Sequence, residues 1–215
     1  MSMVIAIKDK DRVYMACDSQ ASQGSHKYST NSDGCMKIFK SDELDNCIIG
    51  GVGLCNSINL IRYKNLFPES ICYRNELDHE FLQTSFGFRI RDIIKEYDLD
   101  DEKDNGTISS NFIIAHKNKI YHLCNDMMVR EYDEIGCAGA CKDIAYGCLE
   151  TNKDEPIKKR IVETMMACTK YDFSVGFPLV ILNTKNNKKE VLTEKDCIEY
   201  LKGVEENDSE EKSNN

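Results

Sequence analysis

The stretch SMVIAIKDKDRVYMACD, residues 2–18, decides the fold. An apolar, largely β-branched segment at 4–7 and an apolar segment at 13–17 flank a polar turn at 8–11, a pattern that predicts an antiparallel hairpin. A strand that starts at the second or third residue fixes the N-terminus inside the fold, whereas most chain termini fray. We therefore expect the first residues to be ordered.

Grouped strands and paired helices follow along the rest of the chain. Strands are expected at 36–39, 47–51, 112–115, 120–124, 175–183 and 190–192, with weaker strand material at 129–135; helices are expected at 54–65, 76–97, 138–151, 155–169 and 193–201. Residues 20–34 are rich in Ser, Gly, Asn and Thr and are expected to form a loop. The order is not a regular βαβ alternation. It favours an α+β fold in which helix pairs cover packed sheets, such as a four-layer α/β/β/α sandwich.

Composition limits the function classes. The 215 residues, 41% of them hydrophobic, suit one domain over 1–202, followed by an acidic tail at 203–215 that is expected to be disordered. The net charge of -9 and the absence of a basic stripe argue against nucleic-acid binding. No signal peptide or apolar run of membrane-spanning length occurs, so we expect a cytoplasmic protein. The 11 cysteines include no CxxC pair, which indicates reduced, mostly buried thiols and no metal site.

Ser2 is the first candidate for chemistry. Removal of Met1 leaves a free α-amine beside the Ser2 hydroxyl. An α-amine has an ordinary pKa of about 7.7–8.0, so it can accept a proton at neutral pH. One residue would then supply both nucleophile and base. Serine is common at position two, so this feature is weak by itself.

Asp18 and Lys37 are the next candidates. Asp18 ends the second strand of the hairpin, which places a carboxylate beside the first strand. Lys37 alternates with apolar neighbours in a short strand, so it either faces solvent or is buried beside a partner, and the pattern alone favours solvent. Asp18 can also be explained as a turn-capping residue.

The N-terminal segment resembles that of proteasome β-type subunits, and most closely the bacterial proteasome-like peptidases that work with an AAA+ unfoldase. Ala16-Cys17-Asp18-Ser19-Gln20-Ala21-Ser22-Gln23-Gly24 is similar to the family's Ala-x-Asp-Ser/Gly-x-Ala-Thr-x-Gly motif. Counted from Ser2, Asp18 falls at the family's spacing without a gap. Serine stands where the family has a threonine nucleophile, so the methyl group that helps to fix the rotamer is missing.

Two further segments continue the resemblance. The run 36–38 is similar to the family's Lys-Lys-Val/Ile, whose second lysine is catalytic and corresponds to Lys37. The glycine-rich run 50–53 resembles the turn that provides the oxyanion-hole N–H, which implies this role for Gly53. Gly51 and Cys55 would then lie near the substrate's side-chain pocket. A strand-to-helix turn explains Gly53 equally well.

Three tentative site residues come from the last two turns. The run 135–139 resembles the family's Gly-Ser-Gly-Gly turn, with Cys137 in place of the serine, although a packed cysteine is the simpler interpretation. The run 171–176 is similar to Asp-x-x-Ser-Gly-Gly and implies roles for Asp172 and Ser174, which are one residue closer together than the motif requires.

The resemblance implies a serine/threonine-type endopeptidase without metal or cofactor. Ser2 attacks a peptide carbonyl and its own amine takes the proton. Lys37, held charged by Asp18, stabilises the developing alkoxide, and the Gly53 N–H stabilises the tetrahedral oxyanion. Ser22 would bind the backbone of a peptide or unfolded-protein substrate as an added strand.

Alternative functions remain open at this stage. The chain could be a catalytically inactive, structural subunit of a proteasome-like assembly, which retention of Met1 would favour. It could also be an amidohydrolase of the same superfamily that acts on small amides. The resemblance further implies a ring-forming homo-oligomer and an AAA+ unfoldase as partner.

Overall fold

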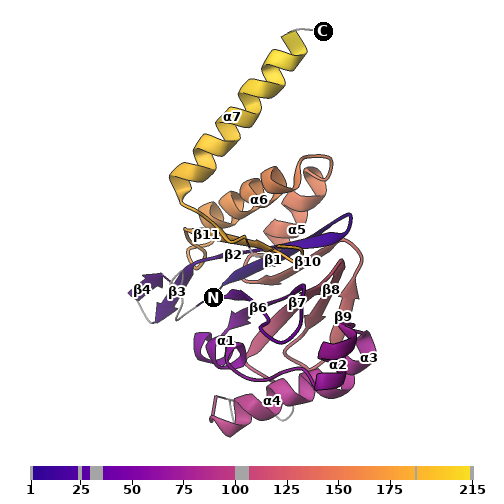
Figure 1. Cartoon of the computed structure of the whole chain (residues 1–215). Helices are drawn as coiled ribbons and strands as arrows, with labels where there is room; N and C mark the ends of the chain where they lie inside the picture. Colours follow the sequence, from indigo (N-terminus) through magenta and orange to yellow (C-terminus); the bar gives the residue numbers. More distant parts are fainter. Residues whose placement is uncertain (1, 24–25, 30–35, 100–106, 187, 214–215) are drawn as a thin grey trace.

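Two five-stranded antiparallel sheets form the centre of the computed structural model, which describes residues 2–23, 26–29, 36–99, 107–186 and 188–213 (Figure 1). The first sheet has the order β10 (Ile135–Gly139), β1 (Met3–Asp9), β2 (Arg12–Asp18), β11 (Leu179–Asn183) and β12 (Glu190–Leu192). The second has the order β5 (Ile38–Lys40), β6 (Cys47–Gly53), β7 (Ser110–His116), β8 (Lys119–Leu123) and β9 (Val129–Tyr132).

Helices cover the outer face of each sheet. The first sheet carries α5 (Lys142–Thr151) and α6 (Ile157–Tyr171), and the chain ends in α7 (Glu194–Ser213). The second sheet carries α1 (Cys55–Arg62), α2 (Glu69–Arg74), α3 (His79–Phe81), the π-helical segment η1 (Leu82–Phe86) and α4 (Gly87–Glu96). The expected four-layer α/β/β/α arrangement is therefore confirmed.

Three hydrophobic clusters correspond to the three interfaces between these layers. One lies between α5–α7 and the first sheet, one between the two sheets, and one between the second sheet and α1–α4. Strand β1 shows how the sequence fills two of them. Met3, Ile5 and Ile7 belong to the cluster under α5 and α6, whereas Val4 and Ala6 belong to the cluster between the sheets. The period of two in a strand thus makes β1 hydrophobic on both faces.

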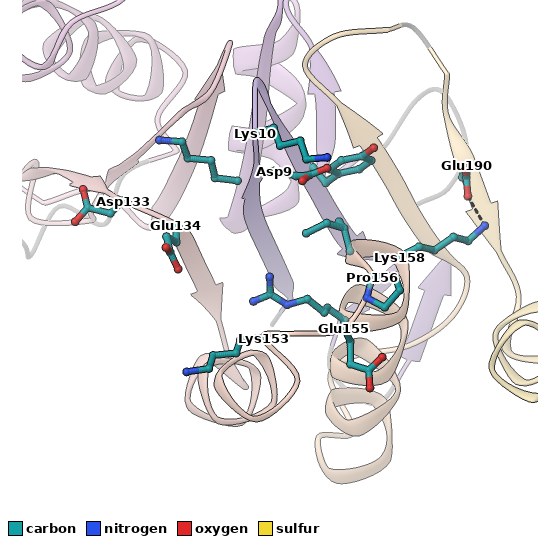
Figure 2. A pocket seen from close by; sticks show the side chains of 13 residues that line it. Asp9, Lys10, Asp133, Glu134, Lys153, Glu155, Pro156, Lys158 and Glu190 are labelled. Atoms are coloured by element: carbon teal, nitrogen blue, oxygen red, sulfur yellow. Dashed lines mark hydrogen bonds and ion pairs between the residues drawn. The ribbon is translucent and has the colours of Figure 1, made fainter. Parts of the chain in front are cut away.

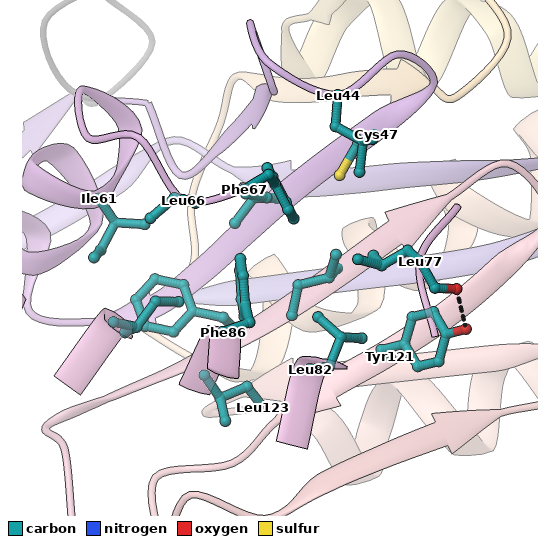
Figure 3. Packing of buried hydrophobic residues seen from close by; sticks show 14 of the residues in the cluster. Leu44, Cys47, Ile61, Leu66, Phe67, Leu77, Leu82, Phe86, Tyr121 and Leu123 are labelled. Carbon is teal, nitrogen blue, oxygen red and sulfur yellow. Dashed lines mark hydrogen bonds between the residues drawn. The ribbon is translucent and has the colours of Figure 1, made fainter. Parts of the chain in front are cut away.

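The outer cluster of the second sheet is rich in aromatic side chains (Figure 3). Phe67 and Phe86 stack with ring centroids 5.3 Å apart. Tyr121 is fully buried, and its hydroxyl donates a hydrogen bond to the Leu77 carbonyl at 3.2 Å. A buried tyrosine needs such an acceptor, because an unpaired hydroxyl in an apolar layer is costly.

Several predicted boundaries are wrong. The segment expected to be a loop at 20–34 contains the strands β3 (Gln20–Gln23) and β4 (His26–Ser29), and its residues 24–25 and 30–34 lie outside the described residues. The helix expected from 138 begins at Lys142, because 135–139 pairs with β1 as strand β10. The helix expected at 76–97 is divided among α3, η1 and α4. Helix α7 continues to Ser213, past the expected end at 201, and projects from the body (Figure 1).

Candidate active site

The N-terminal residue of the proposed mature chain lies at the start of β1, between the ends of β10 and β2. Ser2 is only 3% exposed. Its carbonyl accepts a hydrogen bond from the Ala140 amide at 3.0 Å, and the next amide, Met3 N–H, donates to Asp18 Oδ1 at 2.9 Å. Ser2 is therefore fixed from both sides, by the end of β10 and by the end of β2.

Asp18 and Lys37 form a buried ion pair at this point. Lys37 Nζ lies 2.7 Å from Asp18 Oδ1, and the two side chains are 2% and 0% exposed. The same carboxylate oxygen accepts the Met3 amide, so the ammonium group lies beside the first residues of β1. Lysine is almost never buried without a partner, and here the partner is present. The solvent-facing interpretation of Lys37 is wrong.

Backbone groups complete the surroundings of the ion pair. Asp18 Oδ2 accepts the Gln20 amide at 3.0 Å and the Gly176 amide at 3.1 Å. Lys37 Nζ also donates to the Gln20 carbonyl, at 2.5 Å. The Lys37 carbonyl accepts the Gly51 amide at 2.8 Å, which ties the lysine to strand β6. Both carboxylate oxygens of Asp18 and the ammonium nitrogen of Lys37 therefore have hydrogen-bond partners.

The glycine-rich end of β6 lies beyond this contact. Gly53 is exposed and has φ +124°, and a Cβ there would lie 2.4 Å from the Ser109 carbonyl oxygen, so only glycine fits. Gly51 would place a Cβ 2.6 Å from Ile58. Because the Gly51 amide is already used by Lys37, it is not available to an oxyanion, and Gly53 remains the proposed donor.

Two predicted substrate-contacting residues flank this region. Cys55, at the start of α1, is partly buried. Ser22 is exposed on β3, where it pairs with Lys27 of β4. Their positions agree with a surface that a substrate can reach, and their roles stay predictions.

The turn at 172–176 lies against the ion pair, although through other groups than those predicted. Ser174 donates to Asp172 Oδ1 from its amide at 2.8 Å and from its hydroxyl at 2.5 Å, so these two side chains engage each other. The turn reaches the site through Gly176, whose amide binds Asp18 and whose carbonyl accepts the Ser19 amide at 3.0 Å.

Cys137 does not meet Ser2. It pairs with Ile5 in the sheet and lies in the cluster beneath α5 and α6, with 2% exposure. The residues that meet Ser2 are Gly139 and Ala140, two and three positions further on. Burial raises the pKa of the Cys137 thiol, which stays neutral at physiological pH. We therefore remove Cys137 from the candidate site.

Cys137→Ser tests this placement. A hydroxyl in the apolar cluster should lower the free energy of unfolding by about 1–3 kcal/mol, because it is buried without an assigned acceptor. Peptide hydrolysis by the folded protein should stay within about twofold of the unsubstituted chain. Denaturant titration and a peptidase assay measure the two effects. An activity change of tenfold or more at unchanged stability would return Cys137 to the site.

Sequence reasoning missed three contributors, Gln20, Gly176 and Ala140, as site residues. Gly176 and Ala140 act through backbone groups, so their residue types give little signal, and Gln20 contributes its backbone carbonyl and its side-chain amide. The glycine at 139 is a residue type that could have pointed to this contact. In the structure Gly139 has φ +123°, and a Cβ there would lie 2.0 Å from the Ser2 carbonyl oxygen. Nearby Cys17 adds no charge, because burial raises its pKa to about 12.

A large surface cavity lies away from this site. A surface cavity of about 1010 Å³ is lined by residues near the β1–β2 turn and the start of α6, including Lys10, Glu134 and Lys158 (Figure 2). Asp9 marks the far end of β1 from Ser2. The lining mixes both charge signs, and Lys158 pairs with Glu190 at 2.8 Å. This cavity is not the candidate active site.

Comparison with solved structures shows which fold this chain has. The chain has the fold of bacterial proteasome-like N-terminal-nucleophile hydrolases. Its sequence matches no family model, and no curated protein matches it. The solved structure of Anbu (ancestral beta-subunit) from Yersinia bercovieri has a TM-score of 0.69 and 16% identity, over 98% of this chain and 96% of that one.

Two other solved structures show the same likeness. BPH from Thiobacillus denitrificans, in complex with epoxomicin, has a TM-score of 0.63 and 16% identity, over 84% of this chain and 97% of that one. Anbu from Pseudomonas aeruginosa, solved as a helical assembly, has a TM-score of 0.66 and 14% identity, over 95% and 94%. At such identities the likeness concerns the fold. Among the described residues, none of the helices is long and apolar enough to cross a membrane.

Proposed function

We propose that this chain is a proteasome-like peptidase that hydrolyses peptide bonds with Ser2 as its N-terminal nucleophile. The observation that carries the proposal is the shared oxygen of Asp18, which accepts both the Met3 amide and the Lys37 ammonium at 2.9 and 2.7 Å. This contact places a buried positive charge next to the first residue of the mature chain. Buried, paired charges beside a candidate nucleophile are typical of functional sites.

The proposed reaction has two stages. Ser2 Oγ attacks the peptide carbonyl, and its proton passes to the Ser2 α-amine, directly or through a water. The tetrahedral oxyanion accepts a hydrogen bond from the Gly53 N–H. The C–N bond then breaks, and the leaving amine takes the proton. Water then attacks the resulting ester and gives a proton to the Ser2 α-amine. The ester bond breaks, Ser2 Oγ takes that proton from the amine, and the acid product is released. Lys37 stabilises the alkoxide of Ser2 in both stages, and Asp18 keeps it in position.

The resemblance and the comparisons suggest partners. Anbu from P. aeruginosa forms a helical assembly. We propose that this chain also forms a homo-oligomer, a ring in the simplest case, with an AAA+ unfoldase supplying unfolded protein. The substrate is then a peptide or an unfolded chain, and Ser22, Gly51 and Cys55 would contact it.

One observation favours a second candidate function, a structural subunit without catalysis. The residue that faces the Ser2 carbonyl at the end of β10 is Ala140, whose side chain has no group to hold a terminal amine. A non-catalytic subunit needs no such group. An amidohydrolase of small amides uses the same site and differs only in substrate.

The first test is the intact mass of the purified protein after incubation with a peptide epoxyketone, an inhibitor that reacts with a terminal hydroxyl and its free amine. We expect loss of Met1 and one inhibitor per chain. Ser2→Ala should give no adduct, whereas the control Ser70→Ala, at an exposed position of α2, should be labelled like the unsubstituted chain. A chain that keeps Met1, or that loses it and gains no adduct, would favour the structural subunit.

A further inference from the structure

Both hydrogen-bond acceptors described for Lys37 Nζ come from one short segment. Asp18 supplies its carboxylate and Gln20 its carbonyl oxygen, at 2.7 and 2.5 Å. The position of the ammonium group therefore depends on the backbone at 18–20, where β2 ends and β3 begins. Any group that holds this segment also holds Lys37.

The turn at 172–176 holds that segment with three hydrogen bonds. Two involve Gly176: its amide donates to Asp18 Oδ2 at 3.1 Å, and its carbonyl accepts the Ser19 amide at 3.0 Å. The third comes from a side chain, because Gln20 Nε2 donates to the Phe173 carbonyl at 2.6 Å. Gln20 thus binds the turn with its amide group while its own carbonyl binds Lys37.

We propose that Gln20 is a positioning residue of the active site, whose side-chain amide fixes the carbonyl that orients Lys37. This inference rests on the proposed function. The Gln20 amide does not reach the reacting atoms; it acts through its own backbone. It is also the one member of the three-bond connection that can be changed without altering Asp18 or the backbone of the turn.

Gly176 shapes the space for this side chain. A Cβ at Gly176 would lie 2.5 Å from Gln20 Oε1 and 3.1 Å from Gln20 Cβ. Even alanine at this position would push the carboxamide away from Phe173. The glycine therefore serves the Gln20 side chain as well as the Asp18 carboxylate.

Two substitutions at Gln20 separate positioning from packing. Gln20→Leu keeps the size and removes the donor, and Gln20→Arg supplies a new donor that can reach the Phe173 carbonyl. For Gln20→Leu we expect kcat for a peptide substrate to fall about fivefold or more, the effect of one hydrogen bond, with KM within about twofold. Gln20→Arg should stay within about twofold in both.

Gly176→Ala provides an independent route to the same change. It should lower kcat by a similar factor, and combining it with Gln20→Leu should add little, because both remove the same hydrogen bond. If the losses of kcat in Gly176→Ala and Gln20→Leu multiplied in full in the double variant, the inference would be contradicted. An unchanged kcat in Gln20→Leu, or equal losses of kcat in Gln20→Leu and Gln20→Arg, would contradict it as well.

Hydrogen–deuterium exchange read by mass spectrometry tests the inference without relying on activity. In Gln20→Leu, the amides of Ser19, Gln20 and Gly176 should exchange about fivefold faster, and in Gln20→Arg they should exchange as in the unsubstituted chain. Unchanged exchange in Gln20→Leu would overturn the role of Gln20. An unsubstituted chain without activity would instead overturn the proposed function, while the exchange data would still decide whether Gln20 holds the segment.

Discussion

Replacing Lys37 by methionine should reduce peptide hydrolysis by about 10²- to 10³-fold, the size of effect seen when one preorganised electrostatic group is removed from an active site. Methionine fills similar volume in the buried position but carries no charge. The Ser2 alkoxide would then develop without the Lys37 ammonium group, which in the unsubstituted chain lies 2.7 Å from Asp18 Oδ1. We expect the epoxyketone adduct to form correspondingly slowly.

A loss of stability in Lys37→Met must be distinguished from the loss of peptide hydrolysis. Removing one member of a buried ion pair typically costs about 3–5 kcal/mol, because the other charge stays buried. Here Asp18 keeps three amide donors, from Met3, Gln20 and Gly176, which lessen that cost. Thermal unfolding and size-exclusion chromatography check that the variant is folded. If Lys37→Met does not fold, Lys37→Arg is tested instead, because it keeps the positive charge and moves its position.

Lys40→Met is the matched control, at the end of the strand β5 that Lys37 directly precedes. The Lys40 ammonium is bonded to the Asn186 carbonyl in a partly exposed position, away from Ser2. Its loss should leave hydrolysis within about twofold of the unsubstituted chain. A folded Lys37→Met variant with the activity of Lys40→Met would contradict the assignment of Lys37, and with it the proposed mechanism.

The sequence was most informative where burial follows a simple period. The β1–β2 hairpin was predictable because residues 4–7 and 13–17 are continuously apolar, as expected for a strand with one hydrophobic layer on each side. The strands at 20–29 were not predictable from this signal, because the side chains of β4 are all exposed and no apolar alternation marks them. Helix α7 extends past its expected end at 201, because the residues that follow include Glu and Lys, which are good helix formers.

The candidate site shows a similar division. Ser2, Asp18 and Lys37 could be named because their spacing resembles that of a known family and their side chains carry the chemistry. The turn beside Ser2 was placed at Cys137 and not at Gly139 and Ala140, because small residues at 136–140 suit either a strand end or a helix start. Only the pairing of β10 with β1, more than a hundred residues apart in sequence, decides which residue faces Ser2.

Gly139→Ala should disrupt the site through the backbone of Ser2. Gly139 has φ +123°, a conformation that residues with a Cβ rarely adopt. The added Cβ would lie 2.0 Å from the Ser2 carbonyl oxygen and 3.0 Å from Met3 Cα, so either the end of β10 or the start of β1 must move. The hydrogen bond from the Ala140 amide to Ser2 would be lost with either movement.

The expected loss in peptide hydrolysis is about 10²-fold, because a displacement of about 1 Å at a reacting group has this effect. Backbone strain should also lower the free energy of unfolding by about 1–3 kcal/mol. Gly147→Ala is the control. This glycine lies exposed in α5, and apart from its chain neighbours and the adjacent helix backbone no atom lies within 4 Å of an added Cβ, so alanine should stabilise the helix by up to about 1 kcal/mol and leave hydrolysis unchanged. The rate of epoxyketone labelling, measured together with the denaturant midpoint, separates the two effects. Labelling of Gly139→Ala at the rate of Gly147→Ala would show that the backbone at Ser2 does not have to be held by the end of β10, and the nucleophile would then have to be sought at another residue.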